Sequence, residues 1–119
     1  MEIGPGLFVG HFGGLVLNPY TVIGANCNLS HDVTIGRAGR GDDMGWPTIG
    51  NNVYIAPGAK LIGDIRIGDN AAIGANAVVT SDVPENGVVV GIPGRVVGDA
   101  GSKDYVNNTW PPVVGSSSQ

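Results

Sequence analysis

Two histidines, His11 and His31, are the residues of this sequence best suited to acid–base chemistry. An imidazole titrates near neutral pH, so it can take a proton from a hydroxyl group as that group attacks another molecule. Glycines flank the first histidine in Gly10-His11-Phe12-Gly13-Gly14 and would bring backbone N–H donors close to a developing oxyanion. We therefore consider His11 the candidate general base. For either histidine, the alternative is a corner residue that bonds to a backbone carbonyl.

Other reactive residue types give weaker signals. Cys27 is the single cysteine, so the chain has no internal disulfide, and its place in the repeat described below predicts a small buried thiol rather than a nucleophile. A zinc site with three histidine ligands is excluded because only two histidines exist, and we expect no metal. Asp42 and Asp43 lie in a polar, glycine-rich stretch, where a solvated loop is the simplest interpretation.

The elements that position these residues follow a six-residue repeat. An aliphatic residue returns at every sixth position from Ile49 to Val79 and from Leu17 to Ile35, while Ile3, Val9 and Leu15 keep this spacing in a register offset by two. The fifth position of each later unit is small or β-branched. These fifth positions are Val53, Ala59, Ile65, Ala71, Ala77 and Val83.

A period of six fits neither the 3.6 of an α-helix nor the simple alternation of a strand. It predicts a triangular coil in which each unit forms one flat side and three units form a turn of about 18 residues. Successive turns would stack as parallel strands roughly 4.8 Å apart, with the first position inward and Asn or Gly at corners that need positive φ. The predicted fold is all-β, a single-stranded parallel β-helix of about five coils.

Two breaks in the repeat bear on the histidines and on the domain boundaries. The slip between Leu15 and Leu17 lengthens one turn to about 20 residues, which would place His31 one rung, roughly 4.8 Å, above His11. The gap between Ile35 and Ile49 predicts one protruding loop within Arg37–Pro47, and such loops commonly carry function. We expect residues 1–97 to form the β-helix domain and residues 98–119 to be a flexible tail.

Composition restricts the partners. The net charge is -4 with six Lys and Arg, which argues against a surface for nucleic acid or an anionic membrane. No run reaches the roughly 18 apolar residues of a membrane helix, and the amino terminus lacks the pattern of a signal peptide. We therefore expect a cytoplasmic protein.

Three stretches resemble the serine acetyltransferase family, especially its short members from polysaccharide gene clusters. They are residues 6–16 (GLFVGHFGGLV), residues 33–36 (VTIG) and residues 91–97 (GIPGRVV), the last similar to the ending of hexapeptide acyltransferases. The resemblance covers about residues 3–97. It implies a left-handed β-helix, a homotrimer, and transfer of acetyl from acetyl-CoA to a hydroxyl group.

The resemblance also implies roles for particular residues. His11 would be the general base on the acceptor hydroxyl, and acetyl-CoA would lie along the later coils between subunits. Arg95, with Lys60, would meet the phosphates, which a cationic fork suits. The pantetheine arm would bond to backbone groups near four small residues, Ala56, Gly58, Gly74 and Ala75.

The sequence departs from the family where the family holds its amino acid. Gly10 replaces an Asp before the histidine, and Trp46 stands where the family has a second histidine in the long loop. The family's acidic residue that orients the catalytic histidine would fall before Met1, and its large helical amino-terminal domain has no counterpart in these residues.

His31, Trp46 and Asp43 are accordingly the residues expected at the acceptor. We expect L-serine or a related small molecule as that acceptor. A sugar hydroxyl in polysaccharide biosynthesis and a non-catalytic scaffold remain the alternatives.

Overall fold

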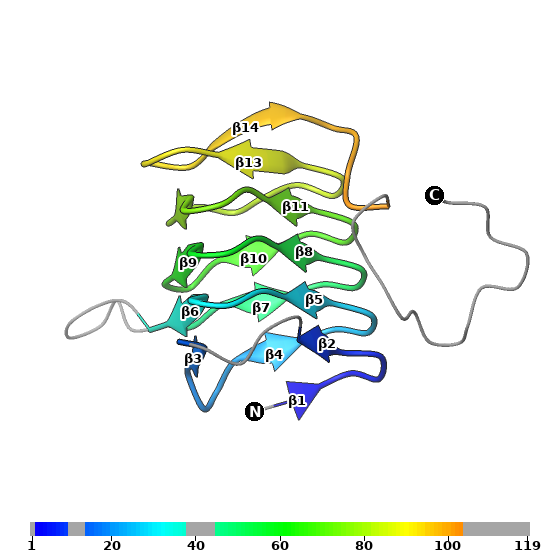
Figure 1. The fold of residues 1–119 in the computed structure, drawn as a ribbon, viewed down its shortest axis with the longest axis vertical. Helices are drawn as coiled ribbons and strands as arrows, with labels where there is room; N and C mark the ends of the chain where they lie inside the picture. Colours follow the sequence, from blue (N-terminus) through cyan, green and yellow to red (C-terminus); the bar gives the residue numbers. More distant parts are fainter. Residues whose placement is uncertain (1, 10–13, 38–44, 104–119) are drawn as a thin grey trace, which may run out of the picture.

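The structure, a computed structural model, describes residues 2–9, 14–37 and 45–103. Within these ranges every regular element is a short β-strand, and the strands rise in a stack from the amino-terminal end to the carboxy-terminal end (Figure 1). No helix in the described ranges is long and apolar enough to cross a membrane. The strands are β1 (Glu2–Ile3), β2 (Phe8–Val9), β3 (Val16–Leu17), β4 (Val22–Ile23), β5 (Asn28–Leu29), β6 (Thr34–Gly36), β7 (Thr48–Ile49), β8 (Tyr54–Ile55), β9 (Lys60–Ile62), β10 (Arg66–Ile67), β11 (Ala72–Ile73), β12 (Val78–Val79), β13 (Val88–Val90) and β14 (Arg95–Gly98).

The strands form the three sides of a prism. Sheet A contains β1, β4, β7 and β10; sheet B contains β2, β5, β8, β11, β13 and β14; sheet C contains β3, β6, β9 and β12. Consecutive strands pass from A to B to C, so three strands make one turn, and all pairs are parallel except β13 with β14. The predicted left-handed parallel β-helix is therefore confirmed. We name its edges the A–B, B–C and C–A corners.

The register of the strands follows from the aliphatic repeat. Leu29 pairs with Ile55 and Ile55 with Ile73, so the first position of each unit stacks on the next inside the prism. Burying one such side chain contributes about 1.5–3 kcal/mol, which a single unit could not gain alone. Phe8 pairs with Asn28, so the first turn takes the predicted 20 residues. The fully buried column contains Ile23, Leu29, Ile35, Ile49, Ile55, Leu61, Ile67 and Ile73.

Asparagines close the A–B corner on successive turns. Asn52 and Asn70 have φ of 59° and 64°, and the Asn52 Nδ2 group donates a hydrogen bond of 3.2 Å to Asn70 Oδ1. Asn tolerates this left-handed conformation better than other residues with a Cβ atom. The series along this corner, as the sequence predicted, consists of Gly6, Asn26, Asn52, Asn70 and Asn86.

The repeat shortens by two residues after Val79, which differs from the sequence prediction. Val83, expected at a fifth position, forms a parallel bridge with Ile67 and so takes a first position in sheet A. The Asp82 Oδ1 atom accepts a hydrogen bond of 2.9 Å from the Arg66 N–H. The Asp82 carboxylate thus accepts the Arg66 N–H bond, which a backbone carbonyl accepts at the equivalent place in the turn below. The shortened turn therefore leaves this N–H with a partner.

The chain continues beyond β14 as a strap along the A–B corner. The Ser102 side chain is 1% exposed, and its Oγ donates a hydrogen bond to the Asn52 carbonyl oxygen. Gly101 has φ of 71°, and a Cβ there would lie 2.7 Å from the Asn70 carbonyl oxygen. This strap extends past the domain boundary predicted after residue 97.

We expect Asn70→Ala to lower the free energy of unfolding by about 1–3 kcal/mol, because alanine would hold a strained positive φ and lose the bond to Asn52. Asn70→Gly is the matched control, since glycine adopts this φ without strain. Scanning calorimetry of both variants checks this. If both variants lose the same free energy of unfolding, backbone strain is not the cause of the loss in Asn70→Ala.

Burial raises the pKa of the Cys27 thiol from its usual 9.0 to about 11, and the Sγ atom donates a hydrogen bond of 3.2 Å to the Gly50 carbonyl oxygen. The folded protein therefore holds this proton where the unfolded chain has released it, so stability should fall as pH rises from 9 to 11. Urea unfolding at pH 7, 9 and 10.5 measures this effect. Replacement by alanine should remove this part of the pH dependence, and an unchanged profile would contradict the assignment.

Candidate active site

Equivalent residues of successive turns line the B–C corner. His31, Pro57, Ala75 and Gly91 each lie two residues after an inward residue of sheet B, and those inward residues pair in register. We call these four residues the corner column. The Gly58 N–H donates to the His31 carbonyl at 3.1 Å, and the Asn76 N–H donates to the Pro57 carbonyl at 3.0 Å.

Ala75 is exposed, and within the described ranges its N–H and carbonyl make no backbone hydrogen bond to a neighbouring turn. At Ala75 and Gly91 the corner column is exposed and has little side-chain cover, which suits an extended ligand.

A second line of residues runs beside the column on sheet B. The Ala56 N–H donates to the Ile73 carbonyl at 2.9 Å, and a Cβ at Gly74 would lie 3.0 Å from the Val90 Cγ1 atom. Val90 in turn pairs with Arg95 of β14. Arg95 therefore stands at the carboxy-terminal end of the same strip, and its side chain is exposed.

Lys60 supplies another cation at this corner. It begins β9 on sheet C, is exposed, and its Nζ atom donates a hydrogen bond of 3.1 Å to the Gly58 carbonyl. All six residues that the sequence assigned to the cosubstrate thus lie along one edge of the prism. The arrangement can hold an elongated polar molecule whose anionic groups meet Lys60 or Arg95.

The acceptor residues are not all brought together. His31 is half-buried at the B–C corner, whereas Trp46 lies beyond β6 at the C–A corner, across the width of sheet C. Trp46 instead packs on Tyr20, with ring centroids 5.1 Å apart and planes tilted by 35°. His11 and Asp43 lie outside the described residues, as do Asp42 and residues 38–44 of the predicted loop.

Sequence reasoning missed several of these features. Pro57 and Gly91 occupy, in later turns, the position that His31 occupies in its own turn. The sequence analysis did not name them, although counting in sixes would have found Pro57. The contact of Tyr20 with Trp46 could not be predicted, because the repeat is interrupted before Trp46 and the spacing of the two residues is therefore irregular. Among the described residues, no group of three or more His, Cys, Asp or Glu side chains is arranged to hold a metal.

A family model describing bacterial transferase hexapeptide repeats (six repeats) matches residues 47–81. The chain is 43% identical over 96 residues to a serine acetyltransferase of Synechococcus elongatus, which covers 81% of this chain and 39% of the relative. It is 39% identical over 117 residues to that of Mycobacterium tuberculosis, covering 97% of this chain and 51% of the relative. The chain therefore spans about half or less of the length of these relatives.

Solved structures of serine acetyltransferases resemble this chain as well. The serine acetyltransferase of Brucella abortus in complex with coenzyme A superposes with a TM-score of 0.80 at 38% identity, covering 85% of this chain and 40% of that one. The Neisseria gonorrhoeae enzyme in complex with serine gives 0.75 at 42% identity, covering 82% and 39%. In sequence and in fold, this chain is serine acetyltransferase-like, and it carries the hexapeptide repeat of bacterial transferases.

Proposed function

We propose that this protein transfers an acetyl group from acetyl-CoA to the hydroxyl group of L-serine or a related small acceptor. The observation that carries the proposal is the B–C corner, where exposed backbone, Lys60 and Arg95 lie along one edge of a β-helix related to serine acetyltransferases. The relatives include a protein crystallised with coenzyme A and one crystallised with serine.

Acetyl-CoA would lie along the corner column. The pantetheine amides would bond to peptide groups near Ala56, Gly58, Gly74 and Ala75, where small side chains permit close approach. The phosphates would meet Arg95 at the carboxy-terminal end, with Lys60 beside the arm. This orientation points the thioester down the column toward His31 and the turn below it.

His11 would act as the general base. It follows β2 by two residues, as His31 follows β5, and Val9 of β2 pairs with Leu29 of β5. The imidazole would take the acceptor's hydroxyl proton as the oxygen attacks the thioester carbonyl, and a backbone N–H would hold the oxyanion. Collapse of the tetrahedral intermediate breaks the carbon–sulfur bond, and the imidazolium returns the proton to the leaving thiolate.

A homotrimer would complete the site. The outward residues of β2, β8 and β13 in sheet B, such as Phe8, Tyr54 and Val88, carry no charge, whereas those of sheet A include Glu2 and Arg66. A cyclic trimer joins two different faces of neighbouring protomers, and this uncharged part of sheet B suits such an interface. Trp46 would then reach the acceptor from a neighbouring protomer.

A sugar acceptor is the second candidate. The Tyr20–Trp46 pair favours it, because stacked aromatic rings, one of them 60% exposed, offer an apolar face that a sugar ring can cover. A thiol-release assay with L-serine and a panel of nucleotide sugars separates the two acceptors. A non-catalytic scaffold would release no thiol with any of them.

We expect His11→Ala to lower turnover by at least about a hundredfold, the low end for loss of a general base. The thiol-release assay at saturating acetyl-CoA measures this, and sedimentation confirms that the oligomer is intact. His31→Ala, which removes the other imidazole, is the matched control and should lower turnover clearly less. A small effect of His11→Ala in an intact oligomer would remove its assigned role.

For Arg95→Ala, the KM for acetyl-CoA should rise about three- to tenfold, because an exposed charge-assisted contact to phosphate is lost. The KM for the acceptor should stay within about twofold. Arg37→Ala, at another exposed arginine, serves as the control. If both variants weaken acetyl-CoA binding equally, the loss reflects the net charge of the protein and not a contact between Arg95 and the phosphates.

A further inference from the structure

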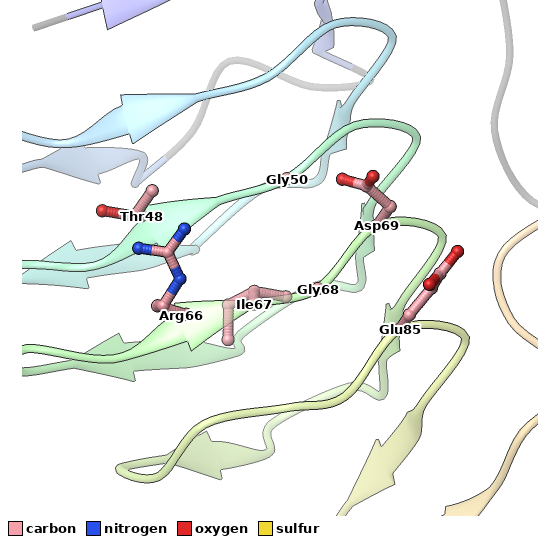
Figure 2. A pocket seen from close by; sticks show the side chains of 7 residues that line it. All are labelled: Thr48, Gly50, Arg66, Ile67, Gly68, Asp69 and Glu85. Carbon is pink, nitrogen blue, oxygen red and sulfur yellow. The ribbon is translucent and has the colours of Figure 1, made fainter.

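We propose that the outer face of sheet A carries a second binding site, for a small zwitterion such as an α-amino acid. A hollow of about 290 Å³ lies on this face (Figure 2). Ligand pockets commonly begin near 300 Å³, so this hollow suits a very small molecule. Its lining consists of Thr48, Gly50, Arg66, Ile67, Gly68, Asp69 and Glu85.

The hollow carries both signs of charge, at two places. Arg66 lies beside Thr48, its partner in the sheet, while Asp69 and Glu85 lie farther along, toward the A–B corner (Figure 2). Within the described ranges the Arg66 guanidinium makes no hydrogen bond or ion pair. The opposite charges therefore remain available to a ligand instead of neutralising each other.

The carboxylate end is held in place by the turns. The Asn51 N–H donates a hydrogen bond of 2.7 Å to the Asp69 Oδ1 atom. A Cβ at Gly50 would lie 2.3 Å from this same oxygen, and one at Gly68 would lie 2.5 Å from the Glu85 nitrogen. The two glycines thus allow each turn to pack closely on the next one at this end of the hollow.

These features select the class of ligand. A carboxylate would bind Arg66 and the Thr48 hydroxyl, and an ammonium group would bind Asp69, with Glu85 adding negative charge at that end. A simple anion or a simple cation would satisfy only one end and meet the opposite charge at the other. The α-amino acid carries both groups within a few atoms.

This site is separate from the one proposed for acetyl transfer. It lies on sheet A, whereas the corner column lies between sheets B and C. Failure of either proposal leaves the other intact.

The test is a titration of the ¹⁵N-labelled full chain with L-alanine, which has no hydroxyl to be acetylated. We expect saturable shifts of the Gly50, Gly68 and Glu85 amides. Acetate and ethylammonium, each with one charge, should bind at least about fivefold more weakly. Shifts confined to residues 56–60 and 74–78, or no saturable shifts, would overturn the proposal.

Variants separate the site from general charge effects. Arg66→Gln and Asp69→Asn should each raise the Kd for L-alanine at least about fivefold, since each removes one charged contact. In the second variant the new side-chain amide oxygen can still accept the hydrogen bond from the Asn51 N–H, so the turn should keep its shape. Arg37→Gln, outside the hollow, should leave the Kd unchanged. Equal weakening by Arg37→Gln, or none by Arg66→Gln, would refute the proposal.

Discussion

Every turn of this β-helix hydrogen-bonds to the next in parallel register, with its aliphatic residue facing inward. Because the inward residue is fixed, every other position of the repeat is fixed as well, and residues at equal positions form lines along the prism. Ile23, Ile49 and Ile67 stack inside sheet A for this reason, and the corner residues His31, Pro57 and Ala75 stack for the same reason. A site on such a scaffold is a column, assembled from single residues many positions apart.

The character of each column depends on which residue types repeat. At the A–B corner, asparagines in a left-handed conformation bond from turn to turn, and the strap ending in Ser102 lies against them. At the B–C corner, small residues leave the backbone exposed, and cations stand beside it at Lys60 and Arg95. The strap covers the first corner, and the second is the one that we propose for binding.

The sequence predicted what depends on periodicity. The inward column, the asparagine corner and the 20-residue first turn all follow from counting in sixes, because each turn must match the one below it. The features that depend on single contacts were not predictable. Asp82 shortens the last full turn by accepting one N–H, and Tyr20 contacts Trp46 only because the chain comes back to the C–A corner after the break in the repeat. The sheet A hollow likewise depends on Arg66 being left without a partner among the described residues, which no spacing reveals.

The proposed chemistry requires that acetyl-CoA occupy the B–C corner. Hydrogen–deuterium exchange of the full chain with and without coenzyme A tests this directly. We expect slower exchange in residues 56–60 and 74–78, with exchange in residues 48–52 and 66–70 unchanged. Protection confined to sheet A, or no protection at saturating coenzyme A, would contradict it.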